Sequence, residues 1–218
     1  MSIPKIQPYH MPHVEEQNER IQWEVAANRS VLLIHDMQQY FLSYYDQTKA
    51  PIPELIANIQ RIRALCHQLN IPIVYTAQPG DQPLAERALL TDFWGTGLVA
   101  DDTITAITPA LAPTQKDIVL AKWRYSAFKK SNLEELMKEV WGRDQLIICG
   151  IYAHIGCMLT AAEAFMLDIQ PFYVTDAVAD FSEEDHLMGI RYAREKCAQT
   201  LQTRALVAQL EALLNMQV

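Results

Sequence analysis

The feature that most constrains the fold is a short apolar run followed directly by a helical pattern. Residues 146–149 are wholly apolar, as a parallel strand buried on both faces requires. Gly150 ends this run, and from Ile155 onward apolar residues occupy nearly every face of a predicted helix, which indicates a buried helix. The intervening turn, residues 152–156, presents backbone N–H groups at a helix N-terminus, where an anion or a developing oxyanion binds well. By itself this pattern is typical of a structural strand–turn–helix joint.

Further apolar runs alternate with helical patterns along the chain. The predicted strands are residues 31–34, 73–75, 117–121, 146–149, 171–174 and 198–201. Helices are predicted to begin at Pro53 and Ile155, and after caps formed by Ser131, Ser182 and Thr203. This alternation predicts an α/β fold of three layers, αβα, with a central parallel sheet of about six strands. No glycine-rich loop follows the first strand, so the pattern does not favour a dinucleotide-binding fold.

The predicted organisation is a single domain, residues 23–218, preceded by an N-terminal arm. Residues 1–22 carry three prolines among polar residues and show no periodicity, which indicates an extended arm laid on the body of the protein or on a partner subunit. Residues 79–97 contain prolines and glycines and are predicted to form a long functional loop with a short helical turn near residues 86–90.

Composition excludes several classes of partner. With 18 Lys+Arg against 26 Asp+Glu, the net charge of −8 makes nucleic acid and anionic membranes poor partners. No apolar run approaches membrane-spanning length and no signal sequence is evident, so the expected compartment is the cytoplasm. The four cysteines are scattered in apolar contexts without metal-ligand spacing, which predicts reduced, buried thiols.

Polar residues stand at the carboxyl ends of the predicted strands. They are Asp36, Gln78, Lys122, the turn 152–156, and Asp176. In parallel sheets of this kind ligands bind outside the carboxyl ends of the strands, so we expect these residues to converge on one crevice. An acid, a lysine and an anion-binding turn in one crevice predict an active site.

Dispersed motifs in the same order resemble the isochorismatase family of cysteine-hydrolase-like α/β proteins. The resemblance covers nearly the whole chain and implies the family's Rossmann-like isochorismatase fold. The motifs are His-Asp-Met-Gln-Gln-Tyr-Phe (35–41), Tyr-Thr-Ala-Gln-Pro (75–79), Asp-Phe-Trp-Gly-Thr-Gly (92–97), Lys-Trp-Arg-Tyr-Ser-Ala-Phe (122–128), Gly-Ile-Tyr-Ala-His-Ile-Gly (150–156) and Asp-Ile-Gln-Pro-Phe (168–172).

At two places the sequence departs from the pattern of many family members, and these departures indicate which members it resembles more. Many relatives, nicotinamidases among them, use an Asp, a Lys and a nucleophilic Cys, but the position matching that Cys is Gly156, with Cys157 one place further on. One residue turns a helical side chain by ~100°, so Cys157 is expected to point elsewhere and to be inert. The metal-binding histidines of nicotinamidases are also missing, because Gln78-Pro-Gly-Asp-Gln occupies their region. Both departures resemble the true isochorismatases, which need no cysteine nucleophile, no metal and no cofactor.

The resemblance implies hydrolysis of the enol ether of isochorismate to 2,3-dihydro-2,3-dihydroxybenzoate and pyruvate, in siderophore biosynthesis. An enol ether is activated by protonation of its terminal methylene carbon, which requires a general acid and no covalent nucleophile. Asp36 is the expected acid. Burial beside Tyr40 and Phe41 and the substrate's carboxylates would raise its pKa from about 3.9, whereas Lys122 would lower it.

The remaining site residues follow from the same resemblance. Lys122 is expected to bind a substrate carboxylate or to orient the ether and the water, and Arg87 is expected to clamp a second carboxylate, for which its planar fork is suited. Backbone N–H groups around Gly156 are expected to face the substrate. The other predicted pocket residues are Gln78, Trp94, Tyr125, Tyr152, Tyr40 and Phe41. The family also implies a non-proline cis peptide near Ile151–Tyr152, whereas His35 and His154 are interpreted as structural histidines.

Several alternatives remain open from the sequence. One is an amidohydrolase of nicotinamidase type with Cys157 as nucleophile; another is hydrolysis of 2-amino-2-deoxyisochorismate, as in phenazine pathways; a third is a non-catalytic pathway scaffold. Siderophore-pathway relatives often continue into an aryl carrier domain, and residues 23–218 leave no room for one. A homo-oligomer and siderophore synthetase partners are expected.

Overall fold

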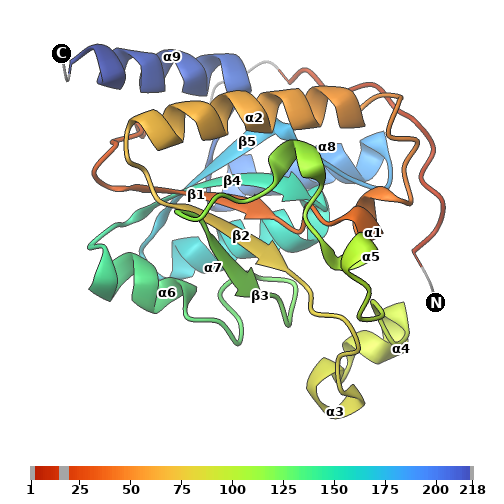
Figure 1. Cartoon of the computed structure of the whole chain (residues 1–218). Coiled ribbons are helices and arrows are strands. Elements are labelled where there is room, and N and C mark those ends of the chain that lie inside the picture. Colours follow the sequence, from red (N-terminus) through yellow and green to blue (C-terminus); the bar gives the residue numbers. More distant parts are fainter. Residues whose placement is uncertain (1–2, 15–19, 217–218) are drawn as a thin grey trace.

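The computed structural model describes residues 3–14 and 20–216, and its centre is one sheet of six parallel strands (Figure 1). The strand order is β3-β2-β1-β4-β5-β6. The strands are β1 (Ser30–His35), β2 (Ile73–Ala77), β3 (Ile118–Ala121), β4 (Gln145–Ile151), β5 (Gln170–Ala179) and β6 (Gln199–Leu201). From β1 the next strands along the chain, β2 and β3, are added on one side, and β4, β5 and β6 are added on the other. Ligands bind in open α/β sheets at such a switch point, here between β1 and β4. The predicted three-layer α/β fold is confirmed.

Helices cover both faces of the sheet. They are α1 (Gln39–Leu42), α2 (Ile52–Gln68), α3 (Leu84–Arg87), α4 (Leu90–Trp94), α5 (Asp102–Thr105), α6 (Leu133–Glu135), α7 (Met158–Met166), α8 (Glu183–Lys196) and α9 (Thr203–Asn215). Single turns lie at Pro109–Leu111, Leu136–Val140 and Ala153–Cys157. Figure 1 shows α2 and α9 above the sheet and α6 and α7 below it.

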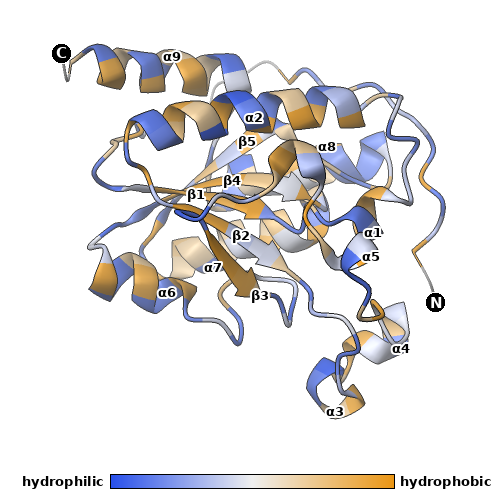
Figure 2. Cartoon of the chain, viewed as in Figure 1, coloured by the Kyte–Doolittle hydropathy of each residue, from blue (hydrophilic) through white to orange (hydrophobic). Residues whose placement is uncertain are grey.

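The alternation of side chains along each buried strand builds two cores. Leu32 and Ile34 face α2 and α9, whereas Val31 and Leu33 face α6, α7 and α8. All the residues of β1 and β4 are buried, so these strands are covered on both faces, and the orange colour of β1 in Figure 2 shows that most of its residues are apolar. Burial of a Val, Leu or Ile side chain stabilises a fold by about 1.5–3 kcal/mol, so the two central strands hold the site on a rigid base.

Three local predictions are wrong. Gly150 does not end its strand: β4 continues to Ile151, and Gly150 (φ 115°) is required because a Cβ there would lie 2.2 Å from the carbonyl oxygen of His35. Helix α7 is not fully buried, because Phe165 is 49% and Met166 72% exposed. Thr203 is the first residue of α9 rather than its cap, and its N–H and hydroxyl both donate to Asp176.

The loop after β2 is more structured than predicted, because it contains two short helices, α3 and α4, instead of one turn. Ser182 caps α8 as predicted, accepting a hydrogen bond from the Asp185 backbone N–H at 3.1 Å.

The described part of the N-terminal segment, residues 3–14, contains no helix or strand and runs along the body of the protein. Ile3, Ile6 and Met11 are buried in the core that also contains α2. Residues 1–2 and 15–19, which also belong to the predicted arm, lie outside the described residues. Among the helices described, none is long and apolar enough to cross a membrane.

Candidate active site

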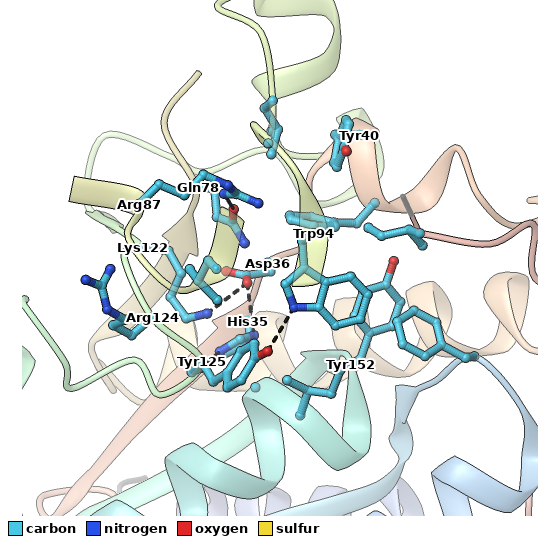
Figure 3. Close-up of a pocket in the computed structure, with 18 residues that line it drawn as sticks. His35, Asp36, Tyr40, Gln78, Arg87, Trp94, Lys122, Arg124, Tyr125 and Tyr152 are labelled. Atoms are coloured by element: carbon cyan, nitrogen blue, oxygen red, sulfur yellow. Dashed lines mark hydrogen bonds and ion pairs between the residues drawn. The ribbon is translucent and has the colours of Figure 1, made fainter. Parts of the chain in front are cut away.

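Asp36 and Lys122 form a buried ion pair at the carboxyl edge of the sheet. Asp36 directly follows β1 and Lys122 directly follows β3, so two strands that end at the same edge deliver them to one place. Lys122 Nζ lies 3.0 Å from Asp36 Oδ2, and the two side chains are only 4% and 8% exposed. Figure 3 shows the pair at the floor of a pocket.

Asp36 is held in an unusual backbone conformation by its neighbour on β2. Its φ of 49° lies in the left-handed region, which non-glycine residues adopt uncommonly, Asp more often than most. The Thr76 hydroxyl donates to Asp36 Oδ1 at 2.6 Å and accepts from the Asp36 N–H at 3.1 Å. Oδ1 is therefore fixed by Thr76 and Oδ2 by Lys122, which leaves little rotational freedom to the carboxylate.

The Asp36 carboxyl is ionised in the free protein. Burial raises its pKa, but His35, Lys122 and the Thr76 hydrogen bond together outweigh burial and hold the pKa below its usual value. Burial lowers the pKa of His35 to about 4, so at neutral pH Lys122 rather than His35 supplies the positive charge. The sequence left open whether burial or Lys122 decides the direction of the Asp36 pKa shift; in the structure His35, Lys122 and Thr76 together outweigh burial and lower the pKa.

His35 explains why position 156 is glycine. A Cβ on Gly156 would lie 2.1 Å from His35 Cε1 and 2.7 Å from its Nε2, so no side chain fits while the imidazole is in place. The fully buried ring is fixed by a 2.7 Å hydrogen bond from Nδ1 to the Ile151 carbonyl, and its Nε2 lies 3.3 Å from the Tyr125 carbonyl. The imidazole thus fills the space from which a nucleophile at position 156 would reach Asp36.

The turn after β4 is less open to an anion than its sequence predicts. It follows the cis Ile151–Tyr152 peptide that the family resemblance implied. The His154 N–H donates to Asp180 Oδ2 at 2.5 Å, and the N–H groups of Ile155 and Cys157 donate to the Tyr152 carbonyl at 3.3 and 3.2 Å. These three donors have protein acceptors, so the predicted anion site at their N–H groups is wrong, although Gly156 itself lines the pocket.

Arg87 brings a second positive charge to the pocket without an acidic partner. Its side chain is bound by neutral groups: Nε donates to the Gly95 carbonyl at 2.6 Å, and Nη1 donates to Gln82 Oε1 at 2.9 Å and to Gln78 Oε1 at 3.4 Å. Arg87 is 3% exposed, and within the described part of the chain no carboxylate forms an ion pair with it. A buried guanidinium of this kind is suited to a ligand carboxylate.

Aromatic side chains form the wall of the pocket that lies across from Arg87 (Figure 3). The Trp94 indole N–H donates to the Tyr125 hydroxyl at 2.8 Å, and the Tyr152 and Phe181 rings lie 4.3 Å apart. The hydroxyl of Tyr152 is buried and has no hydrogen-bond partner in the described structure. A buried polar atom without a partner is costly, so this hydroxyl is suited to a polar group of a bound ligand.

Ten predicted site residues line this one pocket: Asp36, Tyr40, Phe41, Gln78, Arg87, Trp94, Lys122, Tyr125, Tyr152 and Gly156. Asp176 was also expected in the crevice, but it is not among the lining residues, because its carboxylate instead accepts two hydrogen bonds at the start of α9. Residues that were not predicted to bind substrate also line it: Ile3, His35, Leu90, Gly97, Leu98, Arg124, Ile155 and Phe181. Arg124 stands three residues after the predicted strand 117–121, which was a usable signal. Phe181 lies close to a strand end only because β5 continues to Ala179, beyond its predicted end at residue 174, and Ile3 gave no signal.

Cys157 does not face the pocket. It is fully buried in the core of α7 and α8, and burial raises the pKa of its thiol well above the usual value. A protonated thiol buried away from the Asp–Lys pair is a poor nucleophile.

One cluster with metal-ligating side chains lies beside the turn, in the part of the chain that the structure describes. His154, Asp180 and Asp185 place ligand atoms within 4.8 Å of one another. Asp180 Oδ2 accepts from both the N–H and the Nδ1 of His154, and Asp185 Oδ2 accepts from Ser182. The cluster is thus a hydrogen-bonded support for the turn, outside the pocket.

The fold and the pocket define an α/β protein of the hydrolase type whose buried Asp–Lys pair lies at the switch point of a parallel sheet, with glycine where the cysteine hydrolases carry their nucleophile. The Isochorismatase domain matches residues 30–205, and the chain belongs to the isochorismatase family.

Proteins of known name support this assignment. The chain is 54% identical over 212 residues to the isochorismatase of Bacillus subtilis, covering 97% of this chain and 68% of that protein. It is 48% identical over 209 residues to enterobactin synthase component B of Escherichia coli K12, covering 95% of this chain and 73% of that protein. A crystal structure of a cysteine hydrolase from Pseudomonas syringae has the same fold, with a TM-score of 0.81 at 17% identity, covering 88% of this chain and 97% of that one.

Proposed function

We propose that this protein hydrolyses the enol ether of isochorismate to pyruvate and 2,3-dihydro-2,3-dihydroxybenzoate. The observation that carries the proposal is the Asp36–Lys122 pair in a pocket where Gly156 abuts the His35 ring, so that an acid is present and a nucleophile is not. The name of the Bacillus subtilis relative, isochorismatase, supports the same activity.

In this mechanism Asp36 donates a proton to the terminal methylene carbon of the enolpyruvyl group. The resulting oxocarbenium ion is captured by water to give a hemiketal. The hemiketal then breaks the bond between its carbon and the ether oxygen of the carbocycle, which takes up a proton as pyruvate leaves. Lys122 and Arg87 bind the substrate's carboxylates, and Gln78, Trp94, Tyr125, Tyr152, Tyr40 and Phe41 shape the pocket around the ring.

The lowered pKa of Asp36 in the free protein requires that binding itself prepare the acid. A dianion brought next to the buried carboxylate disfavours its charged form, and a substrate carboxylate competes for the Lys122 ammonium. Both effects raise the pKa of Asp36, so the complex takes up the proton that the reaction then delivers to carbon.

The test is pyruvate release from isochorismate, followed through NADH consumption with lactate dehydrogenase. The proposal expects turnover with isochorismate and no ammonia from nicotinamide. The same assay with 2-amino-2-deoxyisochorismate compares the two ether substrates. Asp36 is the only acidic side chain among the described lining residues, so the pocket lacks a separate carboxylate for an ammonium group, which favours isochorismate. Ammonia release from nicotinamide without pyruvate release from isochorismate would contradict the proposal.

The wider setting is part of the same proposal. The similarity to an enterobactin synthase component supports a role in aryl-acid siderophore biosynthesis beside synthetase partners, in the cytoplasm. We further propose that residues 23–218 are one hydrolase domain, that residues 1–22 are its arm, and that the protein forms a homo-oligomer. Light scattering on the purified protein tests the oligomer, because a monomer mass would contradict it.

A further inference from the structure

The N-terminal arm is fixed to the body of the protein next to the pocket. Ile3 is 9% exposed and Ile6 2%, although residues 3–14, the part of the arm around them that the structure describes, form no helix or strand. The Ile6 N–H donates to the Tyr44 carbonyl at 2.8 Å, just after α1, the helix that carries the pocket residues Tyr40 and Phe41. This bond fastens the first residues of the arm to one wall of the site.

A second attachment joins the arm to the turn after β4. The Tyr9 hydroxyl accepts the Asp180 N–H at 2.7 Å and lies 3.1 Å from His186 Nδ1. His186 Nε2 lies 2.9 Å from the Thr175 carbonyl, so Nε2 carries the proton and Nδ1 accepts from Tyr9. Asp180 in turn accepts the N–H of His154 in the turn. Tyr9 therefore holds the arm to the element that positions Tyr152 and Gly156.

Ile3, which precedes both attachments in the chain, reaches the pocket. It is a lining residue of the same pocket as Asp36 and Lys122. Figure 3 shows Arg87, Lys122 and Arg124 on one side of this pocket, and Ile3 adds an apolar lining residue that belongs to the same core cluster as Phe41 and Tyr152. An apolar residue there excludes bulk water from a site whose acid must reach carbon before solvent removes its proton.

We propose that Ile3 is a substrate-binding residue of the active site, contacting the bound substrate from the N-terminal arm. The inference rests on the proposed function only for the identity of the ligand, because Ile3 lines the pocket whatever binds there. The arm is then a working part of the catalytic domain, with Ile6 and Tyr9 as its attachments.

Thiol labelling tests the contact directly. The native cysteines are buried and none of them lines the pocket, whereas position 3 does, so in the Ile3→Cys variant the new thiol is the one expected to react with iodoacetamide. In the background of Asp36→Asn, which is expected to bind without turnover, isochorismate at ten times its Kd should slow labelling of Ile3→Cys by ~10-fold. Lys5→Cys is the matched control, because Lys5 lies on the same arm but is exposed, and its labelling should not change. Equal effects at both positions, or none at Ile3→Cys despite binding, would overturn the inference.

Kinetics provide a second readout that separates contact from folding. Ile3→Ala should raise KM for isochorismate by ~10-fold with kcat within a few-fold of wild type, and Ile3→Val should recover most of that loss. Unchanged constants for Ile3→Ala in an enzyme whose wild type is active would overturn the inference while leaving the proposed function intact. A wild type without pyruvate release would contradict the proposed function instead, and protection of Ile3→Cys by isochorismate would still decide the contact.

Discussion

Lys122 Nζ lies 3.0 Å from Asp36 Oδ2 although the two residues are 86 positions apart in the chain. The pair is buried, so each of the two charges is stabilised by the other. The attraction between the Lys122 ammonium and the Asp36 carboxylate helps to keep Asp36 ionised in the free protein. A general acid must carry a proton, so substrate binding has to reverse this state. The predictions below follow from that requirement and from the packing around it.

The first prediction concerns proton uptake and pH. Because the pKa of Asp36 in the free protein is lowered, kcat/KM should fall about tenfold per pH unit as pH rises through neutrality, while kcat should stay flat to higher pH because bound substrate raises the pKa. Titration calorimetry of a slowly turning-over dianionic substrate analogue, in buffers of different ionisation enthalpy, should show uptake of about one proton. The Asp36→Asn variant should take up none; equal uptake by both proteins would contradict the prediction.

The second prediction concerns Arg87. Replacement of Arg87 by Gln removes the buried guanidinium that lacks an acidic partner in the described structure. A lysine at this position would keep the charge but would not reproduce the planar fork of the guanidinium. Steady-state kinetics of Arg87→Gln should show KM raised by ~100-fold with kcat changed less. The control is Lys130→Ala, which removes an exposed cation of the same region that pairs with Glu86 and should leave both constants unchanged. A KM for Arg87→Gln equal to that of Lys130→Ala would argue against a carboxylate clamp.

The third prediction concerns His35 and Gly156. Gly156→Ala places a methyl group against the imidazole, so it should destabilise the fold by about 1–3 kcal/mol and lower activity. In a His35→Ala background the ring is gone, and the same change should cost much less. Urea unfolding of the four proteins of this cycle measures the coupling, for which we expect at least ~1 kcal/mol. Additive effects would show that the ring and the glycine are independent.

The fourth prediction concerns Cys157. Its thiol lies in the core between α7 and α8, so Cys157→Ala should lower the free energy of unfolding by about 1 kcal/mol while kcat for isochorismate stays within threefold. Iodoacetamide should likewise leave the native enzyme active. Loss of activity in Cys157→Ala without loss of fold would revive a covalent mechanism.

Much of the fold and the placement of the site residues follows from the sequence for a physical reason. Strands buried on both faces leave uninterrupted apolar runs, and the polar residue that ends each run must lie at the carboxyl edge, as Asp36, Gln78 and Lys122 do. Gly150 could not be placed correctly this way, since its close approach to the His35 carbonyl depends on the neighbouring strand.

Other features depend on packing that no local pattern carries. The sequence gives no sign that the His35 ring fills the space at Gly156, or that Ile3 reaches a pocket whose other residues start at position 35. The direction of the Asp36 pKa shift could not be read from the sequence either. It depends on how close the Lys122 ammonium lies to the carboxylate, because that distance decides how far the positive charge offsets burial.

Pyruvate release by Asp36→Asn, measured beside wild type and Cys157→Ala, tests the central claim most directly. The asparagine keeps the size of the side chain and removes the proton that reaches carbon. The account predicts that kcat for isochorismate falls by at least ~10³-fold in Asp36→Asn, with KM changed little and Cys157→Ala fully active. An Asp36→Asn variant that keeps more than about a tenth of wild-type kcat would contradict general-acid catalysis by this carboxyl group.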